Sequence, residues 1–383
     1  MLLYIGLFFF ILLVNYLADR HKTRQIQGLF LSFLVLSVFV GVSDMLGGYD
    51  RYIYGELFDE VAYINTHIGS SYNDATILKL YPSEFGYAGF NILISSISGN
   101  RYVFILLTTL VIYTLYYYSL KKYCINFFFA VALFLGLMFF FTFTYLRQMI
   151  GVGIVWLGLQ YIYKRNPYKF IGCVLLAATF HNSAIIVLPL YFVPLKRFNT
   201  KHIMVFMFFC LLLGLSAVPS ALFNIYGDVA DMQLRSISYA DQEVGFRYEY
   251  IIEAFIFLYI VIKNYDRIPD TEKDSVLLNV MLGFCAILLL FVQSLNGGRL
   301  GWYYLIGVIA TLSTICNDMH VSRSTKIIVL AICFGLFARI VMQWGYLLSP
   351  YKTFFTNGVR DYDPVYDRFE YDSRYAVDKF YKK

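Results

Sequence analysis

Charged residues are what this sequence has least of. Asp, Glu, Lys and Arg make up only 15% of its 383 residues, whereas hydrophobic residues make up 59% and the mean hydropathy is +0.62. Soluble globular domains usually carry about 25% charged residues. The shortage of charge therefore argues against a soluble domain and indicates that most of the chain lies in lipid.

The sequence also lacks the usual signatures of metal centres and soluble enzymes. Its six cysteines include no CxxC pair and no His/Cys metal-ligand spacing, so we interpret them as small packing residues. GxSxG, HExxH, Walker A and dinucleotide fingerprints are missing as well. We therefore expect no cofactor and no metal. The net charge of +6 does not imply nucleic acid, because the cytoplasmic loops of membrane proteins collect Lys and Arg.

Long apolar segments fill most of the chain, and they predict an all-α, polytopic membrane protein. Twelve segments are expected to be membrane helices: 2–18, 26–42, 102–120, 124–144, 147–163, 168–180, 182–195, 202–219, 248–262, 275–292, 300–316 and 326–347. Ten of them would cross, and the short pair 168–180 and 182–195 would form a re-entrant hairpin. The apolar stretch 85–98 is too short to cross and is expected to be an interfacial helix. Residues 1–349 would form one transmembrane domain, followed by a polar aromatic tail at 350–383.

The distribution of Lys and Arg predicts the orientation. Loops 19–25, 120–123, 163–169, 196–202, 263–274 and 317–326 hold sixteen of these residues in 47 positions. Loops 43–101, 145–147, 220–247 and 293–299 hold seven in 97. Positive charge favours the cytoplasm, so the long loops 43–101 and 220–247 are expected outside.

The external loop 43–84 is rich in acids, and two of them are candidates for chemistry. Asp50 follows Gly47 and Gly48, which permit a tight backbone, and Glu84 precedes the non-crossing helix. The alternative interpretation of Glu84 is simple capping of that helix. Tyr54 lies in the same loop and is a candidate for sugar contact.

Arginines are the candidates for binding an anion. Arg147 and Arg299 each open a predicted span at its external end, and Arg339 lies within a span. Arginine grips phosphate oxygens with two hydrogen bonds, and several arginines can neutralise a leaving diphosphate without a metal. Snorkelling at the headgroup level is the alternative for Arg147 and Arg299. Arg339 could instead form a structural ion pair with Glu253.

Other polar residues are expected on the same external side. His181 lies between two half-length apolar segments, hence at the tip of the predicted hairpin, where a polar group is a functional candidate. A structural hydrogen bond is the alternative role for this histidine. Gln148, Arg235 and Arg247 are further candidates for sugar contact.

Taken in order, these residues resemble the motifs of the EpsG-type, Wzy-like polysaccharide polymerases. The motifs are Gly48-Tyr49-Asp50 with Tyr54, Glu84-Phe85-Gly86-Tyr87, Arg147-Gln148, Phe180-His181-Asn182-Ser183-Ala184 and Ser349-Pro350-Tyr351. Their order and spacing match from about residue 40 to residue 351. The resemblance implies a metal-independent glycosyltransferase that joins polyprenyl-diphosphate-linked oligosaccharide repeats, as both donor and acceptor, to make capsule, exopolysaccharide or O-antigen.

The same resemblance implies a bacterial cell (inner) membrane protein whose active face is periplasmic or extracellular. Membrane lipid, a chain-length regulator and a flippase are the partners it suggests. The reaction needs a general base, for which we narrowly favour Glu84 over His181 and Asp50 on position, and one displacement with one base should invert the anomeric centre. A flippase for lipid-linked oligosaccharide is the main alternative, but no internal symmetry between the halves supports it. A membrane acyltransferase is a third interpretation, disfavoured because His181 is expected nearer the outside.

Overall fold

The computed structural model describes residues 1–20, 24–43, 46–67, 71–216, 218–219, 221, 245–294 and 297–355. Within them the regular structure is helical, apart from an isolated bridge between Ser43 and Thr353. The helices are α1 (Leu2–Asp19), α2 (Gln25–Gly41), α3 (Tyr49–Thr66), α4 (Thr76–Leu80), α5 (Phe85–Ser95), α6 (Arg101–Tyr123), α7 (Phe127–Leu137), α8 (Leu146–Gly158), α9 (Gln160–Tyr163), α10 (Pro167–Ala178), α11 (Thr200–Gly214), α14 (Tyr248–Lys263), α15 (Glu272–Leu290), α16 (Leu305–Asn317), α17 (Arg323–Gln343) and α18 (Gly345–Leu348). Five 3-10 segments accompany them, η2 (Tyr72–Asp74), η3 (Phe139–Phe143), η4 (Asn182–Phe192), η5 (Tyr265–Arg267) and η6 (Gly297–Tyr304).

Five helical stretches among the described residues are long and apolar enough to cross a membrane. They are α1, α6, α15, the continuous stretch of η6 with α16, and α17. Further apolar helices are shorter, among them α2, α7, α10, η4 and α11. The all-helical membrane class agrees with the sequence, while the number of twelve spans stays a prediction. Hydropathy does not register breaks such as the one that divides the expected span 124–144 into α7 and η3.

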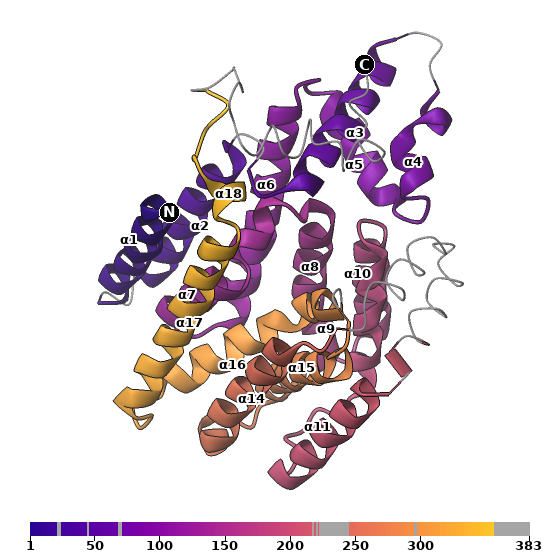
Figure 1. Ribbon diagram of the computed structural model, residues 1–383. Coiled ribbons are helices and arrows are strands. Elements are labelled where there is room, and N and C mark those ends of the chain that lie inside the picture. Colours follow the sequence, from indigo (N-terminus) through magenta and orange to yellow (C-terminus); the bar gives the residue numbers. More distant parts are fainter. Residues whose placement is uncertain are drawn as a thin grey trace.

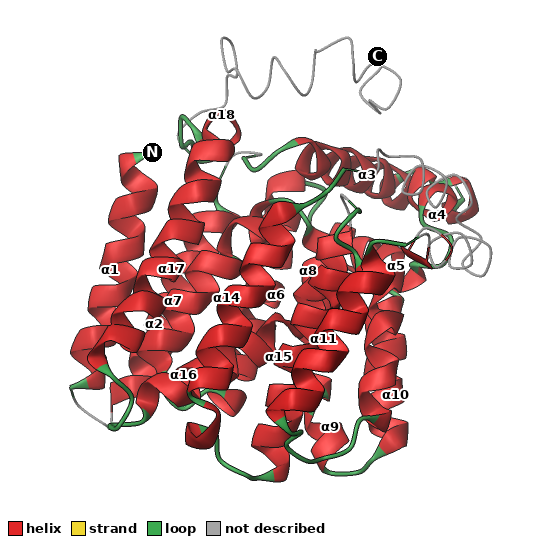
Figure 2. Cartoon of the chain, turned by 60° about the horizontal axis from the view of Figure 1, so that its bottom comes forward, coloured by secondary structure: helices red, strands yellow, loops and turns green. Residues whose placement is uncertain are grey.

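The molecule buries its central helices and turns apolar side chains outward elsewhere. Almost every residue of α7 and α16 and most residues of α15 are buried, whereas α1 and α11 expose large apolar side chains such as Phe9, Phe10, Phe206 and Phe208. In Figure 2, α1, α17, α14 and α11 stand side by side on the side of the bundle that faces the viewer. Extensive outward apolar surface is costly in water and favourable in lipid.

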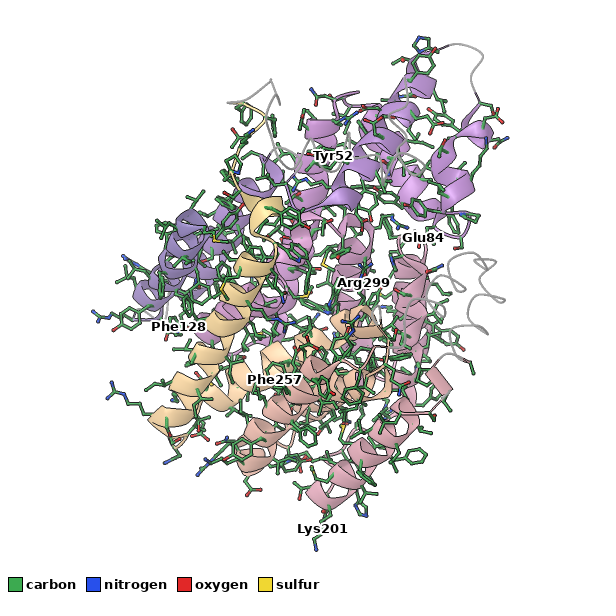
Figure 3. The ribbon with its side chains drawn as sticks, viewed as in Figure 1. Tyr52, Glu84, Phe128, Lys201, Phe257 and Arg299 are labelled. Carbon is green, nitrogen blue, oxygen red and sulfur yellow. The ribbon has the colours of Figure 1, made fainter. Side chains whose placement is uncertain are left out.

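Loops expected on the cytoplasmic side gather at one end. The Lys273 amine donates to the Lys122 carbonyl at 3.1 Å, which joins the start of α15 to the end of α6. Arg197, after η4, donates to the carbonyls of Tyr265 and Ile268 at 2.6 and 3.1 Å. Figure 3 shows Lys201 at the end of the molecule opposite Tyr52, with Glu84 nearer Tyr52.

The region 43–84, expected as an acidic loop, is largely helical, and α5 occupies the helix expected at 85–98. Helix α3 lies across the end of the bundle (Figures 1 and 2) and buries one face through Tyr54, Phe58 and Val61. Arg101 at the start of α6 forms ion pairs with Glu56 and Asp59, which attach α3 to the bundle. Helix α5 has 11 residues, so it spans about 16 Å, roughly half of a ~30 Å hydrocarbon core.

Candidate functional site

A buried ion pair between Glu84 and Arg147 forms the centre of the site. Arg147, in the first turn of α8, donates from Nη1 to Oε2 of Glu84, and the backbone N–H of Asn182 donates to Oε1 at 3.3 Å. Glu84 is 1% exposed and Arg147 is 5% exposed. Although Glu84 precedes α5, its side chain makes no capping hydrogen bond to that helix. The carboxylate is thus directed at Arg147, and capping does not explain it.

Three tyrosine rings surround the Arg147 guanidinium. Its carbon lies 3.6 Å from the Tyr81 ring centre, 5.5 Å from Tyr54 and 5.8 Å from Tyr87, within the range of cation–π attraction. Nε of Arg147 also donates to the Tyr54 hydroxyl at 3.4 Å. Burial raises the pKa of Tyr54, opposed by Arg147, so this phenol stays neutral and keeps a proton to donate. Asp50 lies close enough to act electrostatically on both Tyr54 and Arg147.

His181 occupies the turn between α10 and η4 and directly precedes Asn182, whose backbone contacts Glu84. Its Nδ1 lies 2.6 Å from Ser183 Oγ, and that hydroxyl lies 3.0 Å from the Tyr303 hydroxyl of η6. Gly151 on α8 lets the turn come close, since a β-carbon there would be 3.3 Å from the Ala177 carbonyl and 3.7 Å from His181 Cβ. The hydrogen bonds hold the imidazole in a defined orientation. The start of α10 packs on α9, whose Gln160 accepts a hydrogen bond from Lys122, and the segment after η4 contacts Tyr265 and Asn279. Both ends of the α10–η4 pair therefore lead to the same end of the molecule, as a hairpin requires.

Gln148 and Arg299 connect the other flank of α8 to η6. The Gln148 amide donates to the Arg299 backbone carbonyl at 2.9 Å. The Arg299 guanidinium donates to the Tyr145 hydroxyl at 3.1 Å, and its carbon lies 4.5 Å from the centre of that ring. Residues next to each other on a helix point about 100° apart. Arg147 and Gln148 therefore serve different sides of the first turn of α8.

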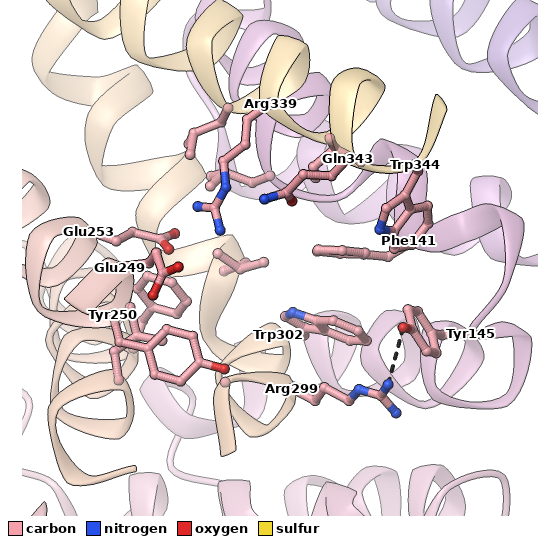
Figure 4. Close-up of a pocket in the computed structure, with 18 residues that line it drawn as sticks. Phe141, Tyr145, Glu249, Tyr250, Glu253, Arg299, Trp302, Arg339, Gln343 and Trp344 are labelled. Atoms are coloured by element: carbon pink, nitrogen blue, oxygen red, sulfur yellow. Dashed lines mark hydrogen bonds between the residues drawn. The ribbon is translucent and has the colours of Figure 1, made fainter. Parts of the chain in front are cut away.

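A cavity of about 400 Å³ lies beside that turn, between α14 and α17 (Figure 4). Arg299 and Arg339 both line it, together with Glu249 and Glu253 of α14. No direct ion pair joins Glu253 to Arg339 in the described part of the chain, although the two charges act on each other. The structural bridge considered for these two residues is therefore not formed.

The structure brings some of the predicted site residues together and separates others. Asp50, Tyr54, Glu84 and Arg147 converge, and the turn that carries His181 joins them through the Asn182 backbone. The three arginines predicted for diphosphate binding do not share one position. Arg147 is engaged with Glu84, whereas Arg299 and Arg339 line the cavity.

Arg247, one of the two further arginines predicted to contact sugar, lies at the start of α14. The backbone N–H of Arg247, which directly precedes α14, donates to the Val292 carbonyl at 2.8 Å. Arg235 lies outside the described residues. Among the described residues, Arg247 therefore does not belong to the convergent group.

Sequence reasoning missed the structural role of Arg51. This residue is 0% exposed and donates to four carbonyls, those of Leu46, Phe143, Val40 and Ser43, at 3.0–3.2 Å. It thereby joins the end of α2 to η3, which leads directly into α8. The preceding Gly47 and Gly48 have φ of 110° and 120°, which confirms the tight backbone predicted there. The only sequence signal for Arg51 was a charge beside two glycines.

Comparison with protein families gives a match over most of the chain. The model of the EpsG family, a family of Wzy-like polysaccharide polymerases and glycosyltransferases, matches residues 28–353. The match covers most of the chain and includes the site residues described above. It confirms the resemblance seen in the motifs. No curated protein and no solved structure matches the chain.

Proposed function

Because this chain belongs to the EpsG family, we propose that it extends a polysaccharide by joining oligosaccharide repeats carried on a polyprenyl diphosphate. The reaction would take place in the bacterial cell membrane, on the external face, at the end of the bundle where Glu84 lies. The growing chain and the incoming repeat would be the two lipid-linked substrates. The family match supports the polysaccharide polymerase class, and the site geometry supports the finer statement.

One observation carries this proposal, namely that motifs far apart in the sequence meet at the Glu84–Arg147 pair. Arg147 contacts Glu84 across 63 positions and Tyr54 across 93, and Glu84 meets the Asn182 backbone across 98. A buried ion pair is a weak source of net stability, because desolvation offsets the attraction between the charges. A pair retained beside an oriented histidine and a tyrosine hydroxyl fits a chemical role better than a scaffold.

The chemistry follows from these groups. The acceptor hydroxyl loses its proton to a general base while its oxygen bonds to the anomeric carbon of the other substrate. The bond from that carbon to the phosphate oxygen breaks, and the lipid diphosphate leaves with the electron pair. Arg147 can exchange Glu84 for phosphate oxygens, with Arg299 on the other flank of α8 as a second cation, so no metal is required. A single displacement inverts the anomeric centre.

The geometry shifts our preference for the base from Glu84 to His181. Both oxygens of Glu84 already accept hydrogen bonds, and the side chain is almost fully buried. His181 is half-buried, and its ring is oriented through Ser183 and Tyr303. Glu84 then serves as a positioning residue that holds Arg147 until a diphosphate arrives. Asp50 remains a further candidate because it lies near Arg147 and Tyr54.

Deletion of the gene in its host tests the function. A polymerase mutant should export single repeats on lipid and make no long polysaccharide, and the wild-type gene should restore the long chains. Loss of exported repeats altogether would instead indicate a flippase. Polysaccharide of unchanged length would overturn both assignments. The purified protein should also polymerise lipid-linked repeat in the presence of EDTA.

A further inference from the structure

The cavity between α14 and α17 has an aromatic wall and a polar wall. Phe141, Tyr145, Trp302 and Trp344 gather on one side, and Phe141 stacks on Trp302 with ring centres 4.3 Å apart. The polar wall comes from α14 and α17 and consists of Glu249, Glu253, Arg339 and Gln343. Figure 4 shows Glu253 and Arg339 directed into the space, with Trp302 and Arg299 across it.

Several polar side chains in this wall have no hydrogen-bonded partner within the described part of the chain. Among the described residues, Glu253, Arg339 and Gln343 take part in no hydrogen bond or ion pair. Glu253 and Arg339 are half-buried within apolar helices. Charged groups at such depth are expensive and usually face a substrate path or a wet cavity. Unpartnered polar groups around an open volume therefore point to a polar ligand.

The charge of the cavity favours a neutral ligand over an anion. Two arginines, Arg299 and Arg339, are balanced by two glutamates, Glu249 and Glu253. The volume of about 400 Å³ lies within the range of roughly 300–1,000 Å³ typical of small-molecule sites, which combine apolar walls with a few placed polar groups. Saccharides have this dual character, because their rings present C–H faces to aromatic side chains and hydroxyls to charged ones.

We propose that this cavity binds the saccharide part of a lipid-linked substrate, an assignment that rests on the proposed function. The aromatic wall supplies the stacking surface, and Glu253, Arg339 and Gln343 bind hydroxyls. The segment η6 joins the cavity to the reaction site. Its Arg299 and Trp302 line the cavity, while its Tyr303 contacts Ser183 of the His181 turn.

Tryptophan fluorescence of the purified full-length protein offers a direct test. The chain has three tryptophans, of which Trp302 and Trp344 line the cavity. The third, Trp156, is fully buried and donates to the Tyr303 carbonyl at 3.0 Å. Oligosaccharides from partial hydrolysis of the host's own polysaccharide should change the emission in a saturable way. Inorganic diphosphate, which Arg299 could also bind, should not abolish this response to oligosaccharide.

Variants assign the signal to the cavity. Trp156→Phe should keep the response, whereas Trp302→Phe and Trp344→Phe should each remove part of it. Glu253→Gln should raise the Kd for oligosaccharide about 10-fold or more, because it removes a charged hydrogen-bond acceptor. Glu272→Gln, an exposed carboxylate at the start of α15, is the matched control and should leave the Kd unchanged.

The possible outcomes separate this assignment from the function itself. A response to diphosphate alone, no response to either probe, or an unchanged Kd in Glu253→Gln would overturn the saccharide assignment. Binding needs no turnover, so Glu84→Gln and Arg147→Lys should retain the fluorescence response while losing polymerisation. A deletion strain with polysaccharide of normal length would overturn the polymerase function and leave the binding result standing.

Discussion

Removing one charge of the Glu84–Arg147 pair should destabilise the protein more than removing both. Glu84→Gln keeps the shape and can still accept the Asn182 N–H, but it removes the carboxylate that pairs directly with the buried Arg147 guanidinium. The side chains are 1% and 7% exposed, so solvent screens them little. Loss of one partner of such a pair costs about 3–5 kcal/mol.

The double variant, Glu84→Gln with Arg147→Gln, replaces the pair with two neutral amides. No buried charge then lacks a partner, so its loss of stability should be smaller than that of Glu84→Gln alone. The double variant also loses the cation–π contacts of Arg147 with three tyrosine rings. This loss reduces the difference in stability between the double variant and Glu84→Gln by about 2 kcal/mol at most. The prediction is therefore that the double variant unfolds at a higher temperature than Glu84→Gln.

The assay is thermal unfolding of the purified protein in one detergent at one scan rate, since unfolding of large proteins is often irreversible. A loss of 3–5 kcal/mol should lower the midpoint by roughly 4–6 °C in a chain of this size. Glu56→Gln is the matched control, because Arg101 keeps its second partner Asp59 and the loss should be smaller. Strictly additive losses in the double variant would refute the coupled ion pair.

Three further predictions concern activity, the second cation and orientation. His181→Asn should lower polymerisation of lipid-linked repeat by about 10²-fold or more without lowering the thermal midpoint, whereas activity within a fewfold of the parent would return the base role to Glu84. Arg299→Lys keeps the charge but loses the planar fork and its stacking on Tyr145, so turnover should drop in folded protein; full activity would count against the diphosphate role. A cysteine at position 165 should not react with an impermeant thiol reagent added to intact cells, and labelling from outside would reverse the predicted orientation.

Much of the fold was predictable because hydropathy reports burial in lipid directly. It placed helices at almost every apolar segment and recognised α5 as too short to cross. It failed at residues 43–66 because acidic residues there were interpreted as a loop. The apolar side chains of α3, Tyr54, Phe58 and Val61, recur at helical spacing and contained the missing signal.

The candidate site was predictable only as a set of residues. Sequence indicated that Glu84, Arg147 and His181 carry chemistry, but not which carboxylate meets which arginine, because such contacts join positions 60 to 100 residues apart. It also suggested a bridge between Glu253 and Arg339, whereas the two helices hold these side chains around a cavity. Cavities depend on how helices are spaced, and hydropathy contains no information on that spacing.

The first turn of α8 explains how two sites can work together. Arg147 reaches the Glu84 side, and the adjacent Gln148 binds the Arg299 carbonyl of η6. The same η6 segment contributes Trp302 to the cavity and Tyr303 to the His181 turn. A polymerase must hold two lipid-linked chains at once while one of them reacts. Under the proposed function, this arrangement supplies a binding place for sugar and a separate place for chemistry, joined by one short and largely buried segment.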